Sequence, residues 1–205
     1  MKVKNVTFLG YSQAVPGDSL YQSAFDVAAA VSRAGYVVVN GGGPGVMRAS
    51  TEGAQYAGGK AVGITFYPKN ATFFEGHDTG NNVDKMIETK SYLERTLKLL
   101  DYGDIYVIFN GGTGTVSEFG MAWGLARLYF GHHKPLILFG GFWYPILEEF
   151  GKHMKLRPEE LKVYRILTEV DEVVPTIHLF EKELGEAHLR DPYNPFKKHA
   201  PPQKR

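Results

Sequence analysis

The stretch from Asp104 to Glu118, DIYVIFNGGTGTVSE, places the strongest limits on how this chain can fold. Its apolar run at residues 105–109 predicts a strand buried on both faces, and a helical pattern of apolar residues begins at Thr115. Glycines in the turn between them let the backbone approach a ligand closely, and the first N–H groups of a helix have no partner inside it. We therefore predict an anion site, although glycines that only make the turn and a helix-start carboxylate at Glu118 would give the same pattern.

The composition is that of an ordinary globular protein. The chain has 205 residues, enough for one domain with a sizeable core, and 43% of them are hydrophobic. A net charge of +1 gives no bulk attraction to nucleic acid or to acidic membranes. The absence of cysteine excludes disulfides, thiolate nucleophiles and Cys-ligated metals. The apolar runs are too short for a signal peptide or a membrane span, so we expect a cytoplasmic protein.

Strand and helix patterns alternate along the chain at the spacing of βαβ units. This alternation predicts an α/β fold, a three-layer, doubly wound, Rossmann-like parallel sheet in a single domain. We expect the domain to span residues 1–184 and residues 185–205 to form a polar tail rich in proline and lysine. The predicted strands cover residues 3–9, 36–39, 61–66, 105–109, 135–139 and 165–169, and the predicted helices cover residues 19–34, 46–56, 86–100, 115–130, 145–154 and 171–184.

Glycine closely follows the end of three predicted strands, at Gly10, Gly41 and Gly111. The carboxyl ends of parallel strands share one edge of the sheet, where ligands bind near the topological switch point. The segments VVVNGGGPG (37–45) and VIFNGGTGT (107–115) also share a pattern, which either two turns facing one ligand or a common turn geometry would produce. The residues that we predict to bind phosphate or nucleotide are Gly10, Ser12, Gly41, Gly42, Gly43, Gly111, Gly112, Thr113, Gly114 and Thr115.

The glycine turns match none of the common nucleotide or hydrolase motifs. Val46 and Ser117 stand where G-x-G-x-x-G requires its third glycine, which argues against NAD and FAD. Neither turn continues into G-x-x-x-x-G-K-[ST], and no G-x-S-x-G nucleophile turn is present. We therefore predict a phosphate site smaller than a dinucleotide site, with no metal and no cofactor.

Glu118 is a candidate for catalysis if a basic side chain lies beside it. Arg95 is the best candidate, because the predicted helix that carries it leads into the strand before the glycine turn. Arg95 comes two turns before the end of that helix and should lie back toward the edge where the turn begins. The alternative interpretation makes Arg95 an exposed cation beside Glu94, and the sequence leaves both open.

The motif GGTGTVSE at residues 111–118 resembles the P-G-G-x-G-T-x-x-E signature of the LONELY GUY (LOG) proteins, also called lysine decarboxylase-like proteins, with Asn110 in place of the proline. The segment GGGPGVM at residues 41–47 is similar to a second motif of that family, and Arg95 corresponds to its catalytic arginine. The resemblance covers residues 3–180. It has two departures, since Thr96 replaces the lysine that usually follows the arginine and Tyr92 replaces a methionine three residues before it.

The resemblance implies a cytokinin riboside 5′-monophosphate phosphoribohydrolase, which hydrolyses the N-glycosidic bond of a nucleoside monophosphate and releases the base and ribose 5-phosphate. It implies that Arg95 and Glu118 are catalytic and that the glycine turn at residues 111–115 holds the 5′-phosphate. Pyridoxal phosphate chemistry is not expected, because no lysine is placed at a strand end beside the turn.

Two further expectations concern partners. The LOG resemblance implies a homodimer or higher homo-oligomer with the site near the subunit interface. The predicted helix at residues 116–130 has apolar groups on more than one face, which also indicates contact with a second subunit. The absence of the lysine at Thr96 keeps a second hypothesis open, a non-catalytic carrier that resembles the molybdenum cofactor carrier proteins and holds a phosphate-bearing ligand.

Overall fold

The computed structural model of the chain describes residues 2–68, 77–128 and 134–190. These residues form a seven-stranded parallel sheet in the order β4-β3-β2-β1-β5-β6-β7. The strands are β1 (Asn5–Leu9), β2 (Val37–Asn40), β3 (Ala61–Phe66), β4 (Lys85–Thr89), β5 (Ile105–Ile108), β6 (Leu136–Phe139) and β7 (Tyr164–Leu167). The helices are α1 (Ser19–Arg33), α2 (Val46–Tyr56), α3 (Tyr92–Tyr102), α4 (Thr113–Leu128), α5 (Trp143–His153) and α6 (Val173–Arg190), with short 3₁₀ turns η1 (Pro158–Leu161) and η2 (Val170–Glu172).

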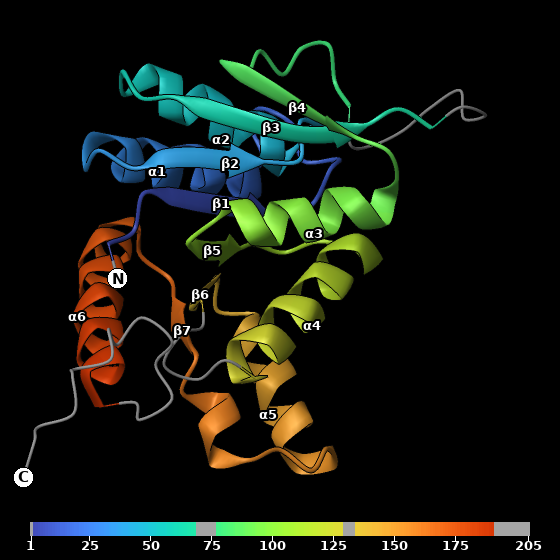
Figure 1. Ribbon diagram of the computed structural model, residues 1–205. Helices are drawn as coiled ribbons and strands as arrows, with labels where there is room; N and C mark the ends of the chain where they lie inside the picture. The colour runs from blue at the N-terminus through green and yellow to red at the C-terminus, as the bar shows by residue number, and fades with distance from the viewer. Residues whose placement is uncertain (1, 69–76, 129–133, 191–205) are drawn as a thin grey trace, which may run out of the picture.

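Helices cover both faces of the sheet (Figure 1). One core packs α1, α2 and α6 against alternate strand residues such as Phe8 and Val107. On the opposite face, α4 and α5 pack against Leu9 and Ile108, and α3 packs against Ile64. Successive side chains of a strand point to opposite faces, so strands apolar throughout supply both cores. The predicted three-layer, Rossmann-like α/β fold is confirmed.

The prediction of one helix over residues 86–100 is wrong, because this segment contains most of the strand β4 followed by most of α3. β4 lies at the edge of the sheet and pairs with β3 alone, so three of its five residues are exposed and it lacks an apolar run. Ser91 then begins α3 as its N-cap, accepting a hydrogen bond from the Glu94 N–H at 3.1 Å, while the Glu94 carboxylate accepts one from the Lys90 N–H at 2.8 Å. The S-x-x-E spacing of this cap was the available signal.

Two helix boundaries also differ from the prediction. α4 begins at Thr113, two residues before the predicted start, so the threonines and the last glycine of the turn belong to its first helical turn. α6 continues to Arg190, past the predicted helix end at residue 184. Residues 191–205 of the predicted tail and residues 129–130 of the predicted helix 115–130 lie outside the described residues.

The topology creates a crevice beside β1. The chain builds β2, β3 and β4 on one side of β1 and returns to place β5, β6 and β7 on the other. The connections after β1 and β5 therefore diverge between the two neighbouring strands, which is the switch point where open α/β sheets bind ligands. In the part of the chain that the structure describes, every helix falls short of the length and apolarity needed to cross a bilayer.

Candidate functional site

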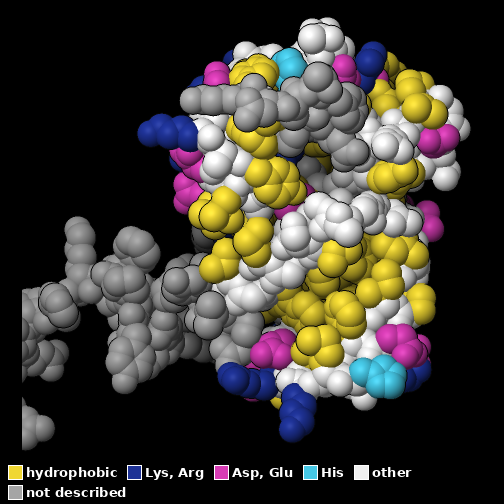
Figure 2. Space-filling model, turned by 90° about the vertical axis from the view of Figure 1, so that its right-hand side faces the viewer, with side chains coloured by type: hydrophobic (Ala, Val, Ile, Leu, Met, Phe, Trp, Pro, Cys, Tyr) yellow, Lys and Arg dark blue, Asp and Glu magenta, His cyan; other side chains and the backbone are white. Residues whose placement is uncertain are grey.

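A pocket of about 470 Å³ opens at this switch point. Figure 2 looks onto the edge of the molecule at the carboxyl ends of the strands and shows the surface hollowed there. The volume falls in the range typical of small-ligand sites, roughly 300–1,000 Å³. The pocket is lined by Phe8, Leu9, Gly10, Tyr11, Ser12, Gly41, Met47, Tyr92, Arg95, Leu99, Gly112, Thr113, Gly114, Thr115 and Glu118.

The first turn of α4 forms one wall of the pocket. Residues 112–115 all line it, and the helix ladder begins with the bond from the Val116 N–H to the Gly112 carbonyl at 3.0 Å. The N–H groups before that bond have no acceptor within the helix, and the helix dipole adds partial positive charge, so this wall can bind an anion. Gly111 lies just outside the lining, where a Cβ would collide with the Thr115 hydroxyl, so the close turn requires glycine.

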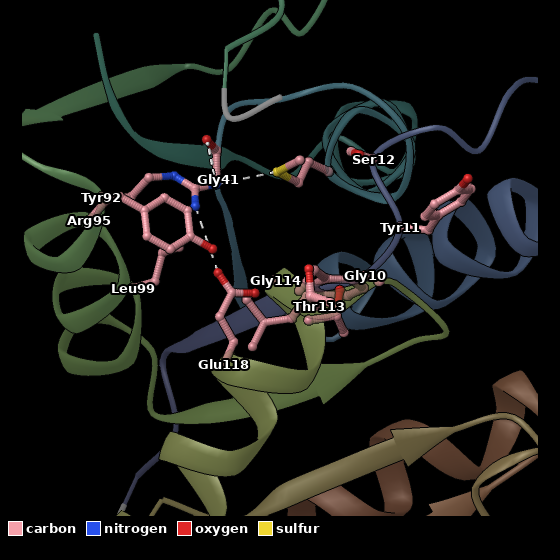
Figure 3. A pocket seen from close by; sticks show the side chains of 15 residues that line it. Gly10, Tyr11, Ser12, Gly41, Tyr92, Arg95, Leu99, Thr113, Gly114 and Glu118 are labelled. Atoms are coloured by element: carbon pink, nitrogen blue, oxygen red, sulfur yellow. Dashed lines mark hydrogen bonds and ion pairs between the residues drawn. The ribbon is translucent and has the colours of Figure 1, made fainter. Parts of the chain in front are cut away.

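Arg95 and Glu118 meet at the base of this wall (Figure 3). The Arg95 Nη1 atom lies 3.7 Å from the Glu118 Oε1 atom, and their side chains are 6% and 9% exposed. Two backbone carbonyl groups hold the Arg95 side chain in place. Its Nε–H donates to the Ile64 carbonyl at 3.1 Å, and its Nη2 donates to the Gly41 carbonyl at 3.2 Å. The alternative of an exposed Arg95 beside Glu94 is therefore wrong. Glu118 is likewise buried.

Burial shifts the pKa of both residues in this pair. Desolvation raises the pKa of Glu118 to about 7, and the neighbouring Arg95 guanidinium offsets only part of that effect. Desolvation also lowers the pKa of Arg95, which the charge of Glu118 opposes, and a guanidinium remains protonated at neutral pH. A carboxyl group with a pKa near neutrality can accept or donate a proton under physiological conditions, as a general acid or base must.

The turn after β2 has a different role from the turn after β5. Gly41 lines the pocket, and its carbonyl oxygen binds Arg95. Gly42 and Gly43 do not line it, and their carbonyl oxygens accept hydrogen bonds from the Asp78 N–H at 3.0 Å and the Asn81 side-chain amide at 2.8 Å.

The start of α2 behind that turn also differs from the start of α4. The Tyr11 carbonyl accepts from the Val46 N–H at 2.9 Å, which is a first-turn donor of α2. The two similar sequence segments thus give one anion-binding wall and one scaffold for Arg95.

Sequence reasoning placed most of the pocket but missed its apolar part. The predicted residues that line it are Gly10, Ser12, Gly41, Gly112, Thr113, Gly114, Thr115, Arg95 and Glu118, and their roles in binding and catalysis stay predictions. Tyr92 and Leu99 were missed, although both are spaced from Arg95 so as to share its helix face, at three residues before and four after. Met47 was missed because its approach depends on how α2 packs beside β2. The lining residues include no lysine, and the described residues contain no cluster of histidines and carboxylates that could hold a metal ion.

The chain matches a family model and is similar in sequence to a known enzyme. The model of the SLOG cluster4 family (LDcluster4) matches residues 3–155. A cytokinin riboside 5′-monophosphate phosphoribohydrolase of Mycobacterium tuberculosis is 33% identical over 121 residues, which are 58% of this chain and 62% of that protein. The chain thus spans less than two thirds of that relative's length.

Solved structures share the fold. The molybdenum cofactor binding protein of Rippkaea orientalis has a TM-score of 0.66 at 22% identity, covering 88% of this chain and 99% of that one. The DNA processing protein A of Helicobacter pylori has a TM-score of 0.56 at 16% identity, covering 88% and 81%. At these identities the likeness is one of fold.

Proposed function

The chain belongs to the SLOG cluster4 family, and from this premise we propose that it is a nucleoside 5′-monophosphate phosphoribohydrolase of the LONELY GUY type. The reaction hydrolyses the N-glycosidic bond and releases the base and ribose 5-phosphate. The observation that carries the proposal is the buried ion pair of Arg95 and Glu118, 3.7 Å apart, beside an anion-binding helix start in one pocket. The motif at residues 111–118 and the 33% identity to the mycobacterial enzyme support the same assignment.

In this proposal, different parts of the pocket hold different parts of the substrate. The 5′-phosphate binds the N–H groups and threonine hydroxyls at the start of α4, which leaves the ribose near Glu118 one helical turn further along. The Glu118 carboxylate takes a proton from water, whose oxygen bonds to C1′. The C1′–N bond breaks with its electron pair passing to the base, which takes up a proton from solvent. Before it accepts the proton of the water, the negative carboxylate stabilises the positive charge that develops on the sugar.

Arg95 acts through Glu118 in this scheme. Two of its nitrogens are anchored to the Ile64 and Gly41 carbonyls, so the guanidinium holds a fixed position beside the carboxyl group. It favours the ionised form of Glu118, which the reaction requires, against the cost of burial. We assign Arg95 this positioning role rather than a contact with the substrate, because the residue is only 5% exposed.

The test is product release from a panel of nucleotides. Purified protein is incubated with AMP, isopentenyl-AMP, GMP and CMP, and with adenosine as the control that lacks the phosphate. Free base and ribose 5-phosphate should appear from at least one monophosphate, and adenosine should be a far poorer substrate because it cannot occupy the wall at residues 112–115. Binding of several monophosphates without release of base would contradict the proposal.

That contradicting result is what the carrier hypothesis predicts. Thr96, which stands where the LONELY GUY pattern has a lysine, is 1% exposed, and its hydroxyl donates to the Tyr92 carbonyl at 3.1 Å. It brings no charge to the pocket, and Arg95 and Glu118 are the charged residues among those described as lining it. A site with this small net charge would suit a protein that holds and releases a phosphate-bearing ligand.

We also propose that the protein acts as a homodimer through α3 and α4. Leu93 and Leu97 of α3 are 62% and 50% exposed, and Val116 of α4 is 57% exposed. Gly120 and Gly124 are exposed on α4 with open space where a Cβ would lie, so a second helix could approach closely. Figure 2 shows hydrophobic side chains gathered over this side of the molecule. The same helices carry Arg95 and Glu118, which places the site beside the proposed interface.

A further inference from the structure

Tyr92 is a pocket residue that the proposed reaction leaves unused. It is the first residue of α3 and lies one turn before Arg95 on the same helix face. Figure 3 shows its ring extending from α3 with the hydroxyl end toward α4. A Cβ built on Gly114 would lie 3.3 Å from the Tyr92 hydroxyl oxygen. The ring therefore reaches from one wall of the pocket to the edge of the anion-binding wall.

Two neighbouring side chains restrict the orientation of this ring. The edge of the Phe66 ring meets it at a centroid distance of 6.2 Å and an interplanar angle of 73°. The Arg95 Cζ atom lies 5.8 Å from the ring centroid, within cation–π range. Tyr92 is nevertheless 42% exposed. An aromatic ring that is held in place and still exposed can bind a ligand at little further cost in side-chain entropy.

We propose that Tyr92 is the residue that recognises the planar ring of the ligand, through aromatic contact rather than hydrogen bonds to particular ring atoms. The proposal rests on the proposed function for the class of ligand. A phosphate bound at residues 112–115 and a ribose near Glu118 would bring the attached base alongside Tyr92, and Met47 and Leu99 add apolar surface to the same pocket. Such a contact selects for a flat aromatic group and discriminates little between one purine and another.

Two substitutions separate the ring from the hydroxyl. Tyr92→Met keeps an unbranched apolar side chain and removes the ring, whereas Tyr92→Phe keeps the ring and removes the hydroxyl. Both are made in the Glu118→Gln background so that AMP is not consumed, and affinities for AMP and for ribose 5-phosphate are measured by calorimetry. We expect Tyr92→Met to weaken AMP binding about 5- to 100-fold with ribose 5-phosphate binding unchanged. Tyr92→Phe should leave both affinities unchanged.

Three results would overturn this role of Tyr92. They are unchanged AMP affinity in Tyr92→Met, an equal loss for AMP and ribose 5-phosphate, and a loss in Tyr92→Phe as large as in Tyr92→Met, which would assign the binding to the hydroxyl. Thermal unfolding of each variant shows that it is folded. The binding measurements do not depend on turnover. A failure of the proposed function would appear separately, as the absence of base release by the protein with Glu118 intact.

Discussion

We expect the ionisation of Glu118 to make both kcat and nucleotide affinity depend on pH. A rise in pH should increase kcat and weaken affinity. Its pKa is raised to about 7, so the carboxyl group is mostly protonated at pH 6 and mostly ionised at pH 8. The protonated form cannot accept the proton of the attacking water, so kcat should fall as pH is lowered through 7. The ionised form repels a bound phosphate, so affinity for a nucleoside monophosphate should weaken as pH rises through 7.

The measurement is kcat and Kd for AMP between pH 5.5 and pH 8.5. The Glu118→Gln variant is the control for Kd, because its pH dependence contains only the ionisation of the phosphate itself. A Kd that varies with pH identically in the two proteins, or a kcat that is constant across this range, would show that Glu118 does not titrate near neutrality.

At this scale the sequence predicted most of the polar residues that line the pocket but not their environment. Glu118 and the glycines around it are close in sequence, and the strand–turn–helix pattern places them together without further information. The burial of Arg95 depends on carbonyl groups of Ile64 and Gly41, which lie 31 and 54 residues away in sequence. Only the order of β2 and β3 in the sheet brings those carbonyls to α3. No periodicity within α3 specifies that contact.

At the scale of elements, the close packing of α1 on α2 depends on Gly53. A Cβ at this position would collide with the Phe25 carbonyl oxygen of α1. We expect Gly53→Ala to force the helices apart and lower the free energy of unfolding by about 1–3 kcal/mol, outweighing the better helix propensity of alanine. Urea denaturation measures the change.

Gly151→Ala in α5 is the matched control for this prediction. It is the same change inside a helix, and nothing lies within 4 Å of the added Cβ. It should leave stability unchanged or raise it by up to about 1 kcal/mol. Equal effects of the two substitutions would show that the α1–α2 contact tolerates the extra methyl group.

The burial of a strand explains whether its sequence pattern predicted it. β5 and β6 are buried along their whole length, and their apolar runs identified them. β4 was not predicted, because an edge strand needs apolar residues at fewer positions. Its sequence KMIET is compatible with a helix as well as with a strand. The order of strands could not be deduced from local pattern, since either side of β1 would accept β5.

At the scale of the whole molecule, the exposed apolar face of α3 and α4 predicts a dimer. The side chain of Gly120→Arg would enter open space in the single chain and add a charge to the proposed interface. We expect the unmodified protein to have the mass of a dimer by light scattering and the Gly120→Arg variant to have that of a monomer. Gly151→Arg is the control, because it adds the same charge to open space on α5 and should remain dimeric. A monomeric unmodified protein, or a dimeric Gly120→Arg variant, would contradict this interface.

In the function that we propose, the Glu118 carboxyl group performs chemistry on a nucleotide held by the start of α4. The most direct measurement compares the Glu118→Gln variant with the unmodified protein, using the monophosphate that the panel identifies as the best substrate. We predict that the variant binds this nucleotide at least as tightly at pH 8 and releases ribose 5-phosphate at least about 100-fold more slowly. Turnover by the variant at the unmodified rate would contradict the account, as would an unmodified protein that binds the nucleotide without cleaving it.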